Sequence, residues 1–297
     1  MDSDNRNKFF SISDISLLSG SIRSLSDVAA ANDCKVFSDP DKFGYFDEAP
    51  KESLSQYVDS PLRKRMSGLS IGIYACLNQI KSSITPDEQM YLFSGCAEIE
   101  TTNKIIKAII NEQSSIVSPT LFHNSVHNTP LGYFTVINKM HNYCTTVSDG
   151  LDTNKSFADF LRLRIQLPGS FIAAAGEDSS EFYSLDTTRD ITIRPAYIAY
   201  RITPSKRGIS ILDSVNDLDK IDYSMYQNVI TDKATFDILN GKVSHLYTDW
   251  AITADMPCSL VFRLAMHNIL GWTGRTLVID KTVSDDSWTL FEVSNEL

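Results

Sequence analysis

Residues 118–150 read SPTLFHNSVHNTPLGYFTVINKMHNYCTTVSDG, and this stretch decides the predicted fold. It opens with a turn at Ser118-Pro119. Apolar residues recur at helical spacing over residues 126–140, which indicates an amphipathic helix. Residues 143–147 then predict a buried strand, which ends at Ser148-Asp149-Gly150. A helix that leads into a buried strand is typical of α/β proteins.

The same alternation continues on both sides of this stretch. Residues 66–80 carry apolar side chains three and four positions apart, which predicts a helix. Residues 90–93 predict a short strand and residues 98–110 a second helix. Downstream, residues 156–163 predict a helix, and the wholly apolar residues 171–175 predict a strand buried on both faces. The alternation predicts class α/β, with a parallel sheet that helices cover on both faces.

The outer parts of the chain are less regular, and no internal repeat is visible in the sequence. Residues 1–60 hold one alternating segment (9–17) and polar loops, and we assign them to the same domain as the rest. The main domain then spans residues 61–297. Within it, the polar residues 213–256 suggest an insertion or lid.

The last third also contains strand signals. Residues 196–202 and 208–212 predict two adjacent strands joined by a turn. A helix is expected from Pro257, because proline is favoured at the first helical position. Residues 276–283 and 287–293 predict a closing hairpin.

Composition excludes several classes of function. The chain has 297 residues, 42% hydrophobic and 22% charged, which is ordinary for a globular protein. Its net charge of -10 argues against binding nucleic acid, which needs a basic face. No apolar run approaches the roughly 20 residues of a membrane helix, and the N-terminus does not resemble a secretory signal.

The five cysteines are scattered and show no CxxC spacing. This pattern fits a reducing compartment better than a disulfide framework or a zinc site. We therefore expect the cytoplasm as the location. The triplet Arg63-Lys64-Arg65 is interpreted as a solvated basic face.

Several side chains are weak candidates for chemistry. Cys96 follows a predicted strand and precedes a helix, as a nucleophile does in a nucleophile elbow, but a small buried residue fits the same place. His123 and His127 stand four residues apart, a spacing that on a helix suits a metal ion. No HExxH pattern accompanies them, so a polar turn is favoured and no metal is expected.

The remaining candidates also have ordinary interpretations. His141, His245 and His267 are isolated in the sequence. Glu177 and Asp178 follow a buried strand, where α/β proteins bind ligands, but polar residues are common at such a strand end. No glycine-rich phosphate loop or dinucleotide fingerprint is present, so no cofactor is expected.

Taken together, these segments resemble a known family. SPTLFHNSVHNTPLGYF is similar to the SPTxFSxSVHNAxxGxxSI signature of the β-ketoacyl-synthase-like proteins encoded with aryl polyene and related type II polyketide pathways. RKRMSGLS, LFSGCAEIETT and SFIAAAGEDSSEFY resemble further segments of that family. The resemblance spans roughly residues 61–293 and is tightest at 118–150.

The resemblance implies a thiolase-like layered α/β/α fold, in a reduced or half-duplicated version. Active ketosynthases of this type carry a nucleophilic cysteine and two histidines, or a histidine and an asparagine. Here the corresponding slot falls within Ser148, Asp149 and Gly150, and it holds no cysteine. The GTxxND and GFGGxN motifs are also absent.

The resemblance therefore implies a non-catalytic subunit similar to a chain length factor. Its partners would be an active ketosynthase and an acyl carrier protein, with no nucleic acid and no membrane insertion. Two alternatives remain open: an acyltransferase or hydrolase that uses Ser148 or Cys96, and a purely structural interaction protein. The side chains expected at the subunit interface or acyl tunnel are Val126, His127, Asn128, Pro130, Tyr133, Phe134 and Ile137.

Overall fold

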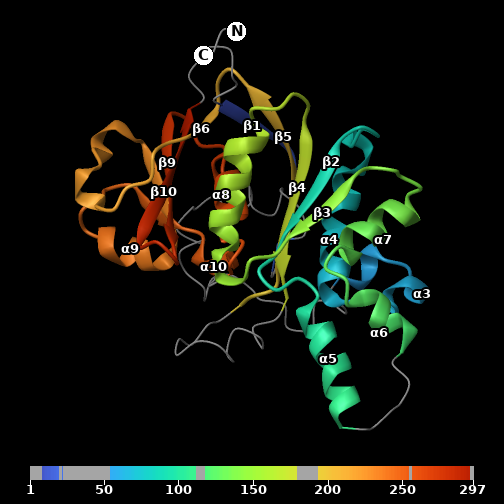
Figure 1. The fold of residues 1–297 in the computed structure, drawn as a ribbon. Coiled ribbons are helices and arrows are strands. Elements are labelled where there is room, and N and C mark those ends of the chain that lie inside the picture. Colours follow the sequence, from blue (N-terminus) through green and yellow to red (C-terminus); the bar gives the residue numbers. More distant parts are fainter. Residues whose placement is uncertain are drawn as a thin grey trace.

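The computed structural model describes residues 9–19, 22, 54–111, 118–178, 193–253 and 256–294. The strands of this part form one sheet in the order β3-β2-β4-β5-β1-β6-β10-β9-β7-β8 (Figure 1). Their bounds are β1 Phe9–Ser19, β2 Gln89–Phe93, β3 Cys144–Val147, β4 Phe171–Glu177, β5 Ala196–Ser205, β6 Ile209–Ile211, β7 Asn228–Thr231, β8 Leu246–Thr248, β9 Arg275–Thr282 and β10 Ser287–Ser294.

The sheet consists of two halves with the same topology. The five strands of each half can be numbered 1 to 5 in chain order. Read from the outer edge of the sheet to its centre, both halves then have the order 3-2-4-5-1, which is β3-β2-β4-β5-β1 in the first half and β8-β7-β9-β10-β6 in the second. In both halves, strands 3, 2 and 4 are parallel and strand 5 is antiparallel to strands 4 and 1. The two halves meet where β1 pairs with β6. The fold is therefore duplicated, although no repeat is visible in the sequence.

The helices differ between the halves. In the first half, α4 lies between strands 1 and 2, whereas residues 212–227 of the second half form only short 3-10 turns. The chain is thus a reduced version of a duplicated fold and not half of one. The helices are α3 Ser60–Arg63, α4 Gly68–Ile80, α5 Ile99–Ile110, α6 Pro119–Asn124, α7 Thr129–Ile137, α8 Thr153–Arg164, α9 Lys233–Leu239, α10 Trp250–Thr253 and α11 Ser259–Ile269.

Three clusters of buried side chains define the layers. The central cluster joins α8 and α11 to the inner faces of both halves, and Figure 1 shows α8 between the two groups of strands. A second cluster packs α4 and α7 against the outer face of the first half. A third packs Leu239 of α9 against Val229, Leu277 and Ile279 of the second half. The result is the expected α/β layering, with α8 and α11 as the shared middle layer.

Most predicted elements lie where the sequence placed them, with three corrections. Residues 213–256 are not an insertion, since β7 and β8 are strands of the second half and β7 pairs with β9. The strands β5 and β6 are not adjacent, because β1 lies between them. The sheet is mixed, because β5 runs antiparallel to β4.

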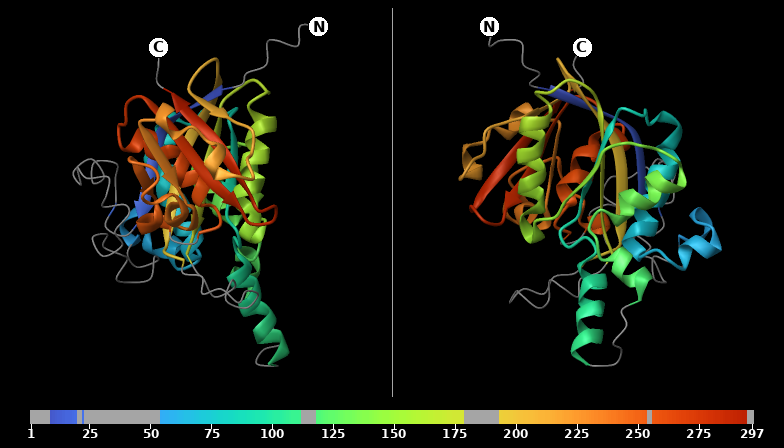
Figure 2. Two further views of the ribbon diagram at one scale, coloured as in Figure 1. Left: turned by 90° about the vertical axis from the view of Figure 1, so that its left-hand side faces the viewer. Right: turned by 45° about the vertical axis from the view of Figure 1, so that its right-hand side comes forward.

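Strand β3 also differs from the prediction of a buried strand. All four of its residues are half-buried, because β3 lies at the edge of the sheet and pairs, in the described part of the chain, with β2 alone. Helix α5 extends away from the body of the molecule in every view (Figures 1 and 2). No helix in the described ranges has the length and apolar character needed to cross a membrane.

Candidate functional site

The carboxyl ends of three parallel strands meet at one edge of the first half. The turn Ser94-Gly95-Cys96 follows β2, Ser148-Asp149-Gly150 follows β3, and Glu177-Asp178 closes β4. Ligand sites of α/β proteins lie at such strand ends. The structure therefore brings together the candidate nucleophiles and the acidic pair that the sequence analysis considered separately.

The backbone of Gly95 connects the three strand ends. Its carbonyl oxygen accepts hydrogen bonds from the Ser148 hydroxyl at 2.9 Å and from the Gly150 amide at 3.0 Å. Its amide donates to Glu177 Oε1. Both backbone polar groups of Gly95 thus hold the turns in place.

Ser148 is exposed, and its hydroxyl makes a hydrogen bond that is typical of a turn residue. In the described residues its Oγ bonds to a carbonyl oxygen, which cannot remove a proton from it. The neighbouring Asp149 accepts from Ser156 Oγ at 2.6 Å, and its amide bonds to Thr153 Oγ1 at 3.1 Å. Gly150 has φ +54°, a conformation that favours glycine. Residues 148–150 therefore form a turn that leads into α8.

Glu177 has a more specific role than an ordinary residue at a strand end. Its side chain is buried, and burial raises its pKa to about 8. Hydrogen bonds from Gly95 and Ser94, which favour the carboxylate, oppose this rise. Burial, together with Glu98 and Glu100, raises the pKa of Asp178 to about 7. Near neutral pH, Glu177 is therefore largely protonated and serves to hold the Gly95 turn.

A second buried carboxyl group, that of Glu98, directly precedes α5 and contacts the start of α4. Glu98 is 2% exposed and accepts hydrogen bonds from Ser67 Oγ at 2.5 Å, Ser70 Oγ at 2.9 Å and Thr101 Oγ1 at 3.1 Å. Burial raises its pKa although these three hydroxyls favour the charged form. Cys96 lies two residues before it and is buried beside the Gly95 turn. Its surroundings are those of a packed residue.

The second half contains a buried ionic cluster that the sequence analysis missed. Arg263 of α11 is 1% exposed and lies between Asp249, at 3.1 Å, and Asp280 of β9. Asn154 of α8 donates to Asp280 Oδ1 at 3.1 Å and accepts from the Leu260 amide at 2.8 Å. The cluster therefore joins the starts of the two central helices. The sequence feature that could have indicated this cluster is Arg263, a charged residue on the apolar face of the helix SLVFRLAMHNI.

The histidines do not form a site in the described structure. His123 lies against the ring of Tyr133, with a centroid distance of 5.3 Å, and His127 is exposed. His267 is buried and its Nδ1 lies 2.8 Å from Thr276 Oγ1. Within the described ranges, no group of three or more metal-ligating side chains converges.

The side chains expected at an interface or tunnel fall into two groups. Pro130 and Phe134 are buried inside the chain, and Phe134 packs edge-to-face on Tyr74 at 6.0 Å. They belong to the core and not to an outward surface. The others are accessible or partly so: Val126, His127, Asn128, Tyr133 and Ile137.

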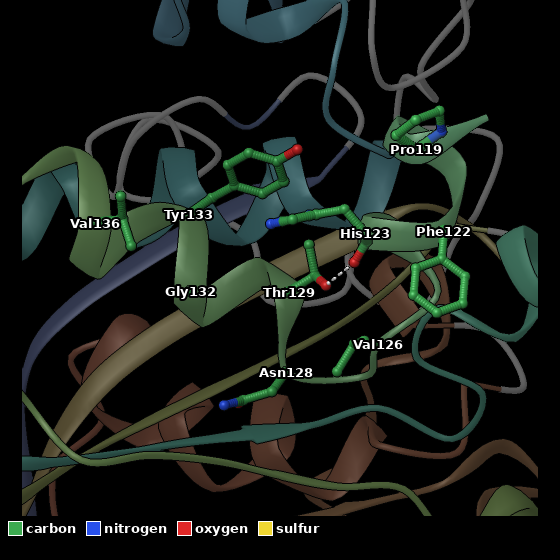
Figure 3. Close-up of a pocket in the computed structure, with 9 residues that line it drawn as sticks. All are labelled: Pro119, Phe122, His123, Val126, Asn128, Thr129, Gly132, Tyr133 and Val136. Carbon is green, nitrogen blue, oxygen red and sulfur yellow. Dashed lines mark hydrogen bonds between the residues drawn. The ribbon is translucent and has the colours of Figure 1, made fainter.

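Of these accessible residues, Val126, Asn128 and Tyr133 border an apolar groove of about 550 Å³ between α6 and α7 (Figure 3), and His127 and Ile137 do not line it. Asn128 ties this groove to the edge strand, because its Nδ2 donates to the Cys144 carbonyl at 3.2 Å. Thr129 Oγ1 donates to the His123 carbonyl at 2.9 Å and fixes the bend between the helices. The lining residues are Pro119, Phe122, His123, Val126, Asn128, Thr129, Gly132, Tyr133 and Val136.

Comparison with known sequences gives one family match. Residues 43–157 match the family model described as beta-ketoacyl synthase, N-terminal domain. This is less than half of the chain, and it includes α4, α5, α6, α7 and β3. A search of curated protein sequences gives no match.

Solved structures with the same fold cover nearly the whole chain. A chain of the ketosynthase ApeO in complex with its chain length factor ApeC from Xenorhabdus doucetiae is 18% identical, with a TM-score of 0.62 over 95% of this chain and 98% of that chain. The ishigamide ketosynthase/chain length factor is 12% identical, with a TM-score of 0.61 over 96% and 98%. A structure of AntDE with AntF, a type II polyketide synthase acyl-carrier protein in complex with its ketosynthase, is 11% identical, with a TM-score of 0.59 over 97% and 99%.

At these identities the likeness concerns the fold alone. The family match confirms the resemblance of residues 118–150 to β-ketoacyl-synthase-like proteins. The chain therefore has the thiolase-like fold of these structures, and its residues 43–157 match the beta-ketoacyl synthase N-terminal domain.

Proposed function

We propose that this protein is a non-catalytic ketosynthase-like subunit, which pairs with an active ketosynthase during the elongation of acyl chains on an acyl carrier protein. The observation that carries the proposal is the slot at the end of β3. It holds Ser148, Asp149 and Gly150 and no cysteine, and the Ser148 hydroxyl donates to the Gly95 carbonyl. A nucleophile needs a base or a lowered pKa, and this contact supplies neither.

A surface suited to a partner supports the pairing. Strand β3 is an edge strand of the described sheet, and edge strands in soluble proteins are usually covered or otherwise protected. Large apolar side chains are exposed on α5, α6 and α7, between α6 and α7, and directly before β3. They are Ile106, Ile109, Ile110, Leu121, Phe122, Val126, Val136 and Tyr143. A cluster of this kind marks a protein interaction site.

The solved ketosynthase and chain length factor complexes with this fold also support the pairing. The carrier protein as a further partner rests on the family resemblance and on the structure that contains an acyl-carrier protein. We further assign residues 1–60 to the same domain, because β1 pairs with both β5 and β6. The free thiols of Cys76, Cys144 and Cys258 fit a location in the reducing cytoplasm.

Intact mass spectrometry after incubation with acyl thioesters tests the catalytic silence. We expect no acyl adduct on the wild-type chain. An adduct that disappears in Ser148→Ala or Cys96→Ala would instead establish the acyltransferase or hydrolase alternative.

The pairing is tested by co-expression with candidate ketosynthases from the same genome. We expect a stable complex of one copy of each, measured by light scattering after size-exclusion chromatography. Separate elution of the two chains would contradict the proposal. A homodimer of this chain with no affinity for the ketosynthase would favour the structural alternative.

A further inference from the structure

The second half of the sheet carries an open cleft at the amino ends of its parallel strands. Asn228 opens β7, His245 directly precedes β8, and residues 271–274 lead into β9. The cleft has a volume of about 580 Å³, within the range of about 300–1,000 Å³ that small-molecule sites occupy. The Arg263 cluster lies toward the carboxyl ends of the same strands, so the cleft is a separate feature of the molecule.

The indole ring of Trp272 lines this cleft and is held in place by two other rings. It packs against Tyr247 with a centroid distance of 4.8 Å, and it meets the buried ring of His267 edge-on at 6.5 Å. Trp272 is half-buried, so part of the ring remains accessible from the cleft. An aromatic face carries partial negative charge and attracts the C–H groups of a ligand that packs flat against it. Trp272 therefore offers a rigid stacking surface.

Two side-chain amides in the same cleft each use only one of their polar atoms. Gln227 Oε1 accepts a hydrogen bond from the Arg275 amide at 2.6 Å, and Asn228 Nδ2 donates to Thr276 Oγ1 at 3.3 Å. Among the described residues, Gln227 Nε2 and Asn228 Oδ1 have no hydrogen-bond partner. One donor group and one acceptor group therefore remain for a ligand.

Gly274 keeps the Gln227 side chain in this position. It has φ +78°, and a Cβ atom added to it would lie 2.8 Å from Gln227 Oε1. A side chain here would push the amide away and strain the backbone. The polar groups of the cleft are thus fixed before any ligand arrives, which lowers the entropy cost of binding.

The charge around the cleft favours a neutral ligand. The described lining contains no aspartate, glutamate, lysine or arginine. Gly271 and Trp272 directly follow α11, and the partial negative charge at the C-terminal end of a helix disfavours an anion. A cation is disfavoured as well, because the Arg275 guanidinium already lies over the Tyr226 ring, 5.2 Å from its centroid. Arg275 is held there by Glu292 at 2.7 Å.

We propose that this cleft binds a neutral sugar, with Trp272 as the stacking surface and Gln227, Asn228 and His245 as hydrogen-bonding partners. A hydroxyl group both donates and accepts, so neighbouring sugar hydroxyls satisfy Gln227 Nε2 and Asn228 Oδ1 together. The C–H face of the sugar ring packs on the indole. A flat aromatic ligand would also stack, but it presents polar atoms only in its own plane. The site is independent of the proposed function.

Titration of the isotope-labelled full chain with glucose, galactose, mannose and N-acetylglucosamine tests the proposal. The chain has three tryptophans, so the indole N–H signal of Trp272 is assigned by its loss in Trp272→Phe. We expect at least one of these sugars to shift this signal saturably. Gln227→Glu keeps the oxygen that accepts from Arg275 but loses the Nε2 donor, and it should weaken sugar binding about tenfold. His245→Ala removes a lining side chain and should weaken binding as well.

Two matched control variants lie outside the cleft. Gln166→Glu makes the same substitution at an exposed glutamine after α8, and His141→Ala removes an exposed histidine that precedes the edge strand β3. Each should change the sugar affinity less than about twofold. Gln227 and His245 are exposed, so their variants should melt at the temperature of the wild type, which thermal unfolding checks.

Three outcomes would overturn the proposal. In the first, none of the sugars shifts the Trp272 signal saturably. In the second, a sugar binds but Gln227→Glu and His245→Ala bind it as tightly as the wild type, so the sugar lies elsewhere. In the third, nicotinamide, choline or inorganic phosphate shifts the signal saturably and no sugar does. The cleft would then take a flat amide, an organic cation or an anion, and the assignment to a sugar would be wrong.

Discussion

The Ser148 hydroxyl lies 2.9 Å from the carbonyl oxygen of Gly95, and this hydrogen bond joins the ends of β3 and β2. The amide of Gly150 donates to the same oxygen at 3.0 Å. Two donors on one carbonyl hold the turn that precedes α8. Ser148 and Gly150 therefore have a conformational role at the end of β3.

Replacing Ser148 by alanine should therefore lower the free energy of unfolding slightly. A neutral hydrogen bond contributes about 0.5–1.5 kcal/mol, and the loss should lie at the low end because Gly150 still satisfies the carbonyl. Urea unfolding followed by circular dichroism measures it. Ser13→Ala, which removes an exposed contact with Asp14, is the control. A loss of more than about 3 kcal/mol would show that Ser148 has contacts beyond the turn.

The buried Glu177 should make the stability of the protein depend on pH. Its pKa is raised from 4.5 to about 8, so the folded state binds a proton more tightly than the unfolded state. The stability from this group is fully present below about pH 4.5 and is lost as the pH rises through about 8. Glu177→Gln keeps an oxygen that accepts from the Gly95 amide but does not titrate. The wild type should lose stability between pH 5 and about pH 8 more steeply than this variant.

Thermal unfolding at several pH values measures the difference. The melting temperatures of wild type and Glu177→Gln should diverge as the pH rises, with the variant higher at about pH 8. Glu88 provides a control, because its pKa is shifted in the opposite direction. The hydrogen bond with Arg201 lowers it to about 2. Its contribution is present above about pH 4.5 and disappears on acidification. Parallel pH profiles for wild type and Glu177→Gln would show that Glu177 is ionised in the fold.

Local elements could be predicted from the sequence because their causes are local. The apolar spacing of α4, α8 and α11 and the apolar run of β4 reflect burial of one helix face or both strand faces. Residues 148–150 follow the end of β3 as predicted, because the strand pattern before them is contiguous in the sequence. The packing of Phe134 could not be predicted, since the same apolar helix face suits a core or an interface.

The duplicated topology could not be predicted because strand order is a property of pairing between distant segments. In the first half, α4 fills the connection between strands 1 and 2, whereas residues 212–227 fill it with short turns. The half-repeats therefore differ in length and in hydrophobic pattern. Strands β7 and β8 are only four and three residues long, which left residues 213–256 without a clear period. Their role follows only from the parallel pairing of β7 with β9.

The Arg263 cluster should be essential to the fold. Arg263→Met leaves Asp249 and Asp280 buried without their cation, and breaking a buried ion pair costs about 3–5 kcal/mol. We expect this variant to unfold at much lower denaturant concentration than wild type. The exposed pair of Lys233 and Asp237 is the control, because Lys233→Met should cost less than about 1 kcal/mol. An equal loss of stability in the two variants would contradict an essential role of the buried cluster in the fold.

Two glycines in helices should respond to alanine with opposite signs. Gly132→Ala should stabilise the isolated chain by about 0.5–1 kcal/mol, because the added methyl group meets no atom of the described residues and alanine favours the helix. Gly72→Ala should destabilise it by about 1–3 kcal/mol, because the methyl group would lie against the buried ring of Tyr197 and force it to shift. Melting temperatures of the two variants measure both effects in one experiment. A destabilised Gly132→Ala would mean that the isolated chain itself occupies the groove, whereas a stabilised one leaves the glycine to be explained by a partner.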